Sequence, residues 1–344
     1  MADINSQTGV LSVGLQSAKD TAATKYVSTI ATVSGLGIKW QERSQAAEHP
    51  AAGGIPWDQT KRNKRRVYSV PIKSTIFLRP NFFPILLMLN GFKCTTSAGP
   101  VANTYTHTLI PATQSELAWY SVLHSLGTTG VDLIARRARN TRGQQLTVKV
   151  GTDESTCDFT AMATLENDQS GSPTVTAEVD NILTTETGTL TCTLGGSALV
   201  TEVSGIDWQW TQTINDSPDR AFTTASMSLE RSQVSSMFTI NDVAASLTLW
   251  QKIARNAAAA TAPTPGAAQV GALSYSILGD VIGATAQAAS VTWTVPAVEF
   301  KLPDNGFEAN GSNLIRQPLT AKVIGENTPA ITIVVINGVT QYVA

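Results

Sequence analysis

The last part of the chain shows the clearest alternation of apolar and polar residues. Within residues 290–302 the apolar positions recur at every second residue up to Val295 and again from Val298. This alternation of β-branched and aromatic residues predicts a strand with one buried face. Pro296 interrupts it, and proline lacks the N–H that a β-ladder needs. We therefore expect an edge position or a bulge at this residue.

Similar patterns predict strands along most of the chain. The remaining ranges with strand character are 33–40, 67–78, 105–110, 117–126, 157–165, 222–229, 273–282, 319–324 and 328–337. Residues 134–150 also have strand character and carry several arginines. A turn at residues 141–143 would make this stretch a hairpin.

Two segments favour helices. Residues 79–91 form an apolar run in which Pro80 or Pro84 can occupy the first turn and Asn81 can serve as N-cap. Asn90 and Gly91 then supply a C-terminal stop that tolerates left-handed backbone. Within residues 237–256, apolar residues recur at intervals of three and four, which predicts a second helix, with a strand at 246–250 as the alternative.

The pattern divides the chain into four regions. Residues 1–27 are polar and are expected to form an arm, and 28–166 form a first β domain. Residues 167–200 are rich in Thr and Gly and lack a core signal, so we interpret them as a linker or variable region. Residues 201–344 form a second β domain. Val-Ser-Gly followed by a tryptophan occurs in both 33–40 and 203–210, which favours a duplicated fold.

Composition supports a mainly β protein, built as a sandwich or barrel. Only 15% of the residues are charged, and the net charge is -2 with a pI near 6.0, so the chain has no global attraction to nucleic acid or anionic membrane. Cys94, Cys157 and Cys192 are widely spaced, which favours buried thiols in a reducing compartment. We expect no signal peptide and no membrane span.

Two clusters of cations are candidate interaction sites. They are the run Lys61, Arg62, Lys64, Arg65 and Arg66 and the group Arg136, Arg137, Arg139 and Arg142. Guanidinium groups bind carboxylates of a neighbouring subunit in a bidentate manner. A solvated surface accounts for either cluster equally well. The first run lacks the aromatic residues that would stack on nucleic-acid bases, so DNA binding is the weaker interpretation.

The sequence gives no pattern for catalysis, a cofactor or a metal. His49, His107 and His124 are not spaced with one another or with cysteines as metal ligands would be. Asp153 and Glu154 are adjacent carboxylates in an expected turn, a poor arrangement for glycoside chemistry. We therefore expect a protein that is not an enzyme.

The C-terminal end resembles that of the tail tube proteins (major tail proteins) of long-tailed bacteriophages. The resemblance rests on the strand 291–300 around Pro296, on the loop near Gly306 and Gly311, and on the final strand 331–337 with Tyr342. It implies a β-sandwich or barrel with a crossing helix, for which 79–91 is in the matching position. It also implies that the loop at 45–66 reaches the adjacent ring.

The resemblance further implies a structural virion protein, made in the bacterial host cytoplasm. Copies of the chain would close rings by continuing their sheets, with six chains per ring or three if the fold is duplicated. The rings would stack around a lumen that holds the tape measure protein and conducts phage DNA. Tail terminator and tail-tip proteins would be further partners, and the chain itself would not bind membrane. The lumen should be polar or acidic so that it does not bind phosphates.

Two alternatives remain. A carbohydrate-binding or adhesin-like sandwich would expose Trp40, Trp57, Trp208 and Trp210 as sugar platforms, whereas a tube protein would bury them. A different virion component, such as a capsid or decoration protein, would share the composition and would differ in the geometry of its particle.

Overall fold

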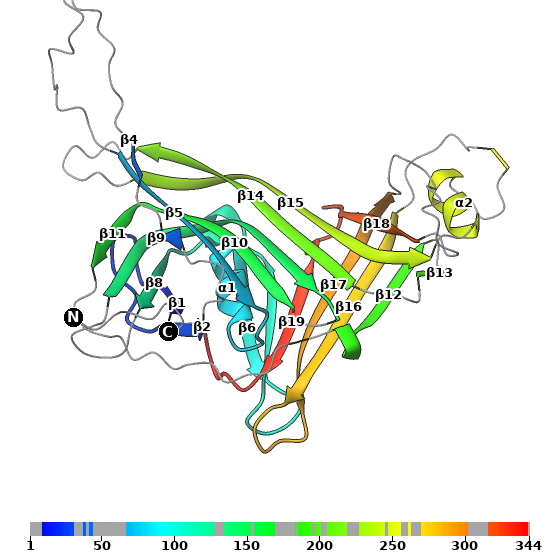
Figure 1. Ribbon diagram of the computed structural model, residues 1–344, viewed down its shortest axis with the longest axis horizontal. Helices are drawn as coiled ribbons and strands as arrows, with labels where there is room; N and C mark the ends of the chain where they lie inside the picture. The colour runs from blue at the N-terminus through cyan, green and yellow to red at the C-terminus, as the bar shows by residue number, and fades with distance from the viewer. Residues whose placement is uncertain are drawn as a thin grey trace, which may run out of the picture.

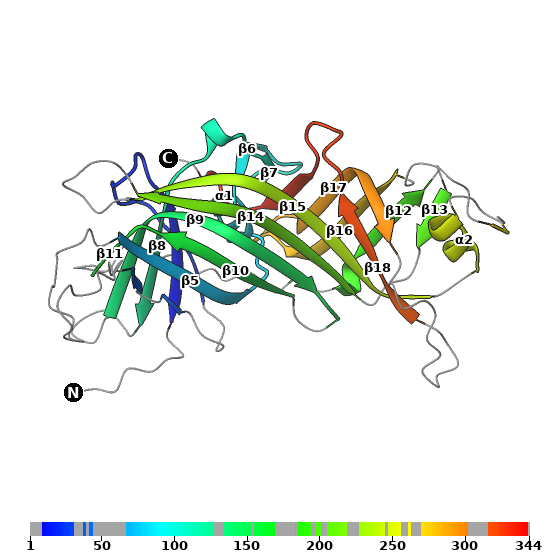
Figure 2. The same ribbon diagram turned by 90° about the horizontal axis from the view of Figure 1, so that it is seen from above.

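The computed structural model describes residues 9–30, 37–38, 41–43, 67–126, 134–152, 155–168, 183, 185–194, 197–200, 205–218, 227–244, 247–255, 261–262, 270–301 and 316–342. These residues form antiparallel strands with short helices, which confirms the mainly β prediction (Figure 1). The molecule is elongated, with two diverging layers of strands in its middle and a smaller sheet at one end (Figures 1 and 2).

The first layer is a twisted antiparallel sheet. Its strands follow one another in the order β5 (Val67–Phe77), β10 (Thr156–Ala163), β9 (Ile134–Val150), β14 (Gly205–Pro218), β15 (Met227–Ala244), β18 (Arg316–Val323) and β17 (Ala288–Lys301). One face of this layer is apolar and buried, as the alternating burial of Cys157, Phe159 and Ala161 along β10 shows. The other face carries polar side chains, as expected of an antiparallel sheet covered on one side.

The second layer shares β17 with the first. Beside the N-terminal part of β17 lie β19 (Thr332–Asn337), β7 (Tyr105–Pro111) and β6 (Phe92–Ala98), in that order. On its opposite edge β17 pairs with β16 (Val270–Val281). The two layers therefore diverge from a common strand, and the C-terminal strands predicted from the alternating pattern are the ones that join them.

Pro296 lies where β17 changes partners. Residues 290–294 pair with β19 and residues 298–301 pair with β18, so the missing N–H of Pro296 falls between the two ladders. On the β16 side the register shifts, because Val295 faces Leu273 while Val298 faces Gly271. The expected bulge is confirmed. Of the two alternatives expected at Pro296, the edge position does not apply, since β17 has neighbours on both sides.

Helix α1 (Phe83–Leu89) fills the space between the layers, and all of its side chains are buried. Its N-cap is Phe82, which makes no side-chain cap, so the prediction that Asn81 would cap the helix is wrong. Pro84 occupies the first turn as expected. Asn90 is the C-cap, and Gly91 follows with a φ of 86°, a conformation that favours glycine.

The smaller sheet contains β2 (Val27–Ile30), β1 (Val10–Leu15), β8 (Tyr120–Leu126), the first part of β9, and β11 (Leu165–Asp168). Strand β9 crosses from this sheet into the first layer, because 134–139 pair with β8 and β11 while 145–150 pair with β10 and β14. The predicted hairpin at 134–150 is therefore wrong. The expected turn residues 141–143 form part of the bend in one continuous strand.

The remaining elements flank these sheets. They are β3 (Gly37–Ile38) and β4 (Gln41–Arg43) beside β5, the short 3-10 helices η2 (Gln114–Glu116) and η3 (Thr185–Thr187), β12 (Thr189–Leu194) and β13 (Ser197–Val200) beside β16, and α2 (Leu247–Arg255). Helix α2 confirms part of the second helix prediction. The preceding residues 237–244 belong to β15 instead.

The proposed halves are linked by hydrogen-bonded ladders. Strand β9 of the first half pairs with β14 of the second, and β7 pairs with β19. In the region expected to be a linker, β12 pairs with β16, and Cys192 and Leu194 are buried there. The domain boundaries and the duplication stay predictions. One copy of the repeated motif overlaps β14, whereas most of the other copy lies outside the described residues.

Aromatic side chains fill the space where the layers diverge. Trp208 of β14 lies 6.1 Å from Trp293 of β17 and 6.2 Å from Phe92 of β6, measured between ring centroids. Trp210 lies 4.4 Å from Phe92, and Phe83 of α1 lies 5.8 Å from Trp293. These rings join β14, β17, β6 and α1 in one apolar core.

Candidate interaction surface

The structure describes one of the two predicted cation clusters. Lys61, Arg62, Lys64, Arg65 and Arg66 lie outside the described residues, as does the loop expected to reach an adjacent ring. Arg136, Arg137, Arg139 and Arg142 all lie on β9. The first three are on the part of β9 in the smaller sheet, and Arg142 follows the bend. The cluster is thus divided between two environments.

The first part of the cluster lies at the surface. Arg136 is exposed, Arg137 and Arg139 are half-buried, and the Nη1 of Arg139 donates to the backbone oxygen of Asp20 at 2.9 Å. His124 on β8 is directly opposite Arg136. Burial, together with the nearby charge of Arg136, lowers the pKa of His124 to about 4. At neutral pH the charge of this surface therefore comes from the arginines.

The bend in β9 is held by Asn140, whose φ is 54°. Its backbone N–H donates to Gln16 Oε1 at 2.7 Å, and its side-chain amide donates to Asp20 Oδ1 at 2.6 Å and Thr164 Oγ1 at 3.0 Å. Asparagine tolerates this left-handed backbone better than most residues do. At the point where β9 changes sheets, hydrogen bonds with side chains far away in sequence therefore replace the regular backbone hydrogen bonds of a β-ladder.

Arg142 is bound inside the protein. Its side chain lies over the ring of Trp119, 3.9 Å from the centroid, and donates to the backbone oxygens of Leu117 and Leu229. The residue is only 8% exposed. Burial, with a contribution from Arg231, lowers its pKa to about 10, so it remains charged at neutral pH. Because these contacts occupy the guanidinium, we do not include Arg142 in a surface for a neighbouring subunit.

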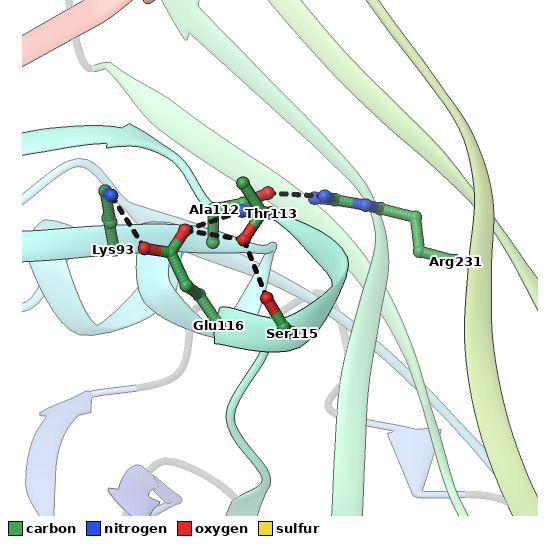
Figure 3. A network of polar contacts seen from close by, with 6 residues as sticks. All are labelled: Lys93, Ala112, Thr113, Ser115, Glu116 and Arg231. Atoms are coloured by element: carbon green, nitrogen blue, oxygen red, sulfur yellow. Dashed lines mark hydrogen bonds and ion pairs between the residues drawn. The ribbon is translucent and has the colours of Figure 1, made fainter.

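Arg231 makes a second contact of this kind, with residues that directly follow β7 and directly precede β6. From β15 it donates to the backbone oxygen of Ala112 (Figure 3). It also donates to the backbone oxygen of Gly91. Beyond Ala112, η2 is closed by a capping box, in which Thr113 N–H donates to Glu116 Oε2 at 2.8 Å. Lys93 of β6 binds the other carboxylate oxygen at 2.8 Å. The bond to Lys93 and those to Thr113 lower the pKa of Glu116 to about 2.

The C-terminal segment is fastened to the residues before α1. Asn337 Nδ2 donates to the backbone oxygen of Pro80 at 2.9 Å, and the Tyr342 hydroxyl donates to that of Asn81. Asn337 Oδ1 accepts from Val339 N–H at 2.8 Å and lies 2.9 Å from His107 Nε2. An amide oxygen only accepts, so His107 donates through Nε2, and its Nδ1 accepts from the hydroxyl of Thr96. Burial lowers the pKa of this neutral histidine.

No group of His, Cys, Asp or Glu within the described ranges is arranged to hold a metal ion. All three cysteines are free, Cys157 and Cys192 are buried and Cys94 is half-buried. Burial raises the pKa of the Cys94 thiol to about 11, which makes it a poor nucleophile at neutral pH. Trp208 and Trp210 are buried and cannot serve as exposed sugar platforms. Trp40 and Trp57 lie outside the described residues.

No protein-family model matches the chain, and no curated protein is significantly similar to it. Within the part of the chain that the structure describes, no helix is both long and apolar enough to cross a bilayer.

The sequence interpretation missed the residues that fasten the layers together. Arg231 stands in a strand without a motif, and Asn337 follows an apolar run in which it looks like a turn residue. Their partners are backbone oxygens of residues more than a hundred positions away. The spacing of neighbouring residues in the sequence does not predict such long-range hydrogen bonds.

Proposed function

We propose that this chain is a structural protein that self-associates into stacked rings and forms the tail tube of a long-tailed bacteriophage. The observation that carries the proposal is the C-terminal unit β17–β19. Its sequence supports the resemblance to tail tube proteins, and β17 is the strand from which both layers extend. In this proposal the tape measure protein and phage DNA occupy the lumen, and the tail terminator and tail-tip proteins bind at the ends.

The polar face of the first layer supports a structural role that does not require tight binding of nucleic acid. Lys149 forms an ion pair with Asp158 at 3.0 Å, and Lys301 lies 3.7 Å from Glu299. These cations are partly neutralised by their own neighbours, so this face would attract phosphate groups weakly. A surface past which DNA must slide needs this property.

The surface arginines Arg136, Arg137 and Arg139 are the described candidates for contacts between subunits. They stand on one strand of the smaller sheet, at the end of the molecule away from α2 (Figure 1). In the proposed assembly they pair with carboxylates of a neighbouring copy. Lys61, Arg62, Lys64, Arg65 and Arg66 stay predicted contacts of the same type.

Negative-stain electron microscopy of the concentrated protein tests the proposal. Hollow tubes of uniform diameter are expected, with sixfold symmetry for a single fold or threefold symmetry for a duplicated one. Closed shells would instead indicate a capsid-like component. Monomers that bind immobilised glycans would favour the carbohydrate-binding alternative, although the burial of Trp208 and Trp210 removes two of its expected platforms.

A further inference from the structure

Strand β15 is longer than the partner on its outer edge. On one side it pairs with β14 from Met227 to Asn241. On the other side β18 pairs with it only between Met237 and Ala244. Strand β18 ends at Val323, and Ile324 N–H then binds the backbone oxygen of Ala297 in β17. No described strand continues the ladder along residues 228–236 of β15.

Elsewhere in the molecule, side chains form hydrogen bonds with backbone groups that have no neighbouring strand. The backbone oxygen of Leu229, at the start of this same stretch, accepts from Arg142. On β16, Thr187 Oγ1 donates to the backbone oxygen of Leu278 at 2.5 Å and accepts from its N–H at 3.3 Å. Unpaired backbone groups on a strand edge are therefore capped in two places. Among the described residues, no such cap reaches the outer edge of 232–236.

The open stretch is regular enough to accept a strand. The bulge in the β14–β15 ladder lies between Arg231 and Gln233, and from Gln233 onward the register is continuous. Figure 2 shows β15 as the outermost strand of the first layer along this part of its length. The sequence Ser-Gln-Val-Ser-Ser at 232–236 contains no lysine, arginine or proline, the residues that commonly protect strand edges.

Apolar side chains flank the stretch on both faces. Val234 is 39% exposed although it is on the side of β15 that carries the buried Phe238 and Ile240. Met237 is 37% exposed on the opposite side. A strand added along 232–236 would cover Val234 with its inward side chains and Met237 with its outward ones. Backbone pairing and apolar burial would then act together, as in other cases of strand addition.

We propose that residues 232–236 of β15 accept an edge strand from a second copy of this chain. The chain has a suitable strand of its own, since β6 pairs with β7 on one side and no described strand pairs with its other side. Strand β6 exposes Lys93, Thr95 and Ser97, and β15 exposes Glu230 near the open stretch. Joining two different edges produces closed rings or open filaments.

The inference rests on the self-association in the proposed function and names where that association occurs. The test is sedimentation velocity over a concentration series for the unaltered protein, Val234→Lys and Val270→Lys. Val270 is the matched control, because it is the same residue type, 41% exposed, and lies at the start of β16, on neither of the two proposed edges. A lysine on the inward side of an open edge blocks strand addition.

We expect Val234→Lys to weaken association at least tenfold and Val270→Lys to leave it within threefold, with unchanged circular dichroism for both. Hydrogen exchange of the unaltered protein supplies a readout that needs no variant. The amides within 233–236 should become protected on association. Association of Val234→Lys at the unaltered strength, no added protection of these amides, or a monomer at every concentration would overturn the inference.

Microscopy of the same samples separates this inference from the proposed function. Tubes formed equally well by Val234→Lys would leave the tube proposal standing and remove β15 as its joining edge. Small oligomers that Val234→Lys dissociates, without tubes in the unaltered protein, would keep the edge assignment and count against the tube.

Discussion

The indole Nε1 of Trp210 donates a hydrogen bond to the backbone oxygen of Asn90, 2.9 Å away. Trp210 belongs to β14 in the first layer, and Asn90 is the C-cap of the helix between the layers. A helix end leaves backbone oxygens without intrahelical partners. The core tryptophan thus satisfies one of these oxygens while its ring packs on Phe92.

We predict that Trp210→Phe destabilises the protein by about 1–3 kcal/mol, since it leaves a buried oxygen without its donor. Chemical denaturation followed by circular dichroism measures the change. Trp208→Phe is the control, because the Nε1 of Trp208 donates to the hydroxyl of Ser236, which can reorient. Equal losses for the two variants would show that ring size, and not the bond to Asn90, sets the cost.

Gly143→Ala should destabilise the protein by about 1–3 kcal/mol, the usual cost of overpacking. A Cβ at this position would overlap Oδ1 and Cγ of Asn90 and lie 2.9 Å from its Cα. Gly151→Ala provides the control, because its Cβ would meet nothing within 4 Å. We expect the control to stay within about 0.5 kcal/mol in thermal or chemical denaturation. A tolerated Gly143→Ala would mean that the end of α1 and the bend of β9 can separate at little cost.

Stability should fall as the pH decreases from 6.5 to about 4, partly through His124. Within this window the unfolded chain binds a proton at the imidazole, while the folded chain, with its pKa lowered to about 4, does not. The free energy of unfolding therefore decreases toward acid, by about 1–3 kcal/mol after allowance for solvent at this half-buried site.

Denaturation of His124→Gln across the same pH range checks this contribution. The variant should lose stability less steeply between pH 6.5 and 4, with the remaining slope coming partly from His107, whose pKa is also lowered. An identical slope in the two proteins would contradict the assignment to His124.

We expect Arg142→Ala to reduce stability, whereas Arg136→Ala should reduce association and leave stability nearly unchanged. Arg142→Ala removes a buried cation and its donors to two backbone oxygens, and we expect a loss of about 2–4 kcal/mol in the free energy of unfolding. Arg136→Ala changes an exposed position, where ionic contacts contribute about 0–1 kcal/mol. In the proposed assembly, Arg136→Ala weakens association. Denaturation of both variants measures the stability, and sedimentation measures the association.

The fold class and many strand positions were predictable because alternation is a local property. The strand along β17 and its bulge at Pro296 follow from residue types within a few positions of one another. The partners of β17 were not predictable, since a strand's own pattern does not specify what lies beside it. Proline lacks a backbone N–H, so it is compatible both with an edge strand and with a gap between two hydrogen-bonded ladders.

The stretch 134–150 shows why the predicted site was only partly recovered. Thr141 to Gly143 has the composition of a turn, but contacts between Asn140 and the distant Gln16 and Asp20 turn it into a bend within one strand. The arginines looked like one cluster because they are close in sequence. The bend places Arg142 against Trp119. Its buried contacts there, and not its closeness in sequence to the other arginines, determine its role.

The sharing of β17 between two layers has a consequence for the order of events during synthesis. Strand β19 lies between β17 and β7, and His107 contacts Asn337 across 230 residues. The second layer therefore cannot close until the chain has emerged from the ribosome at least as far as Asn337. Such distant pairings form late, because a long loop must be closed first. Until then β7 lacks its neighbour, and a nascent chain cannot present the finished surfaces to other copies.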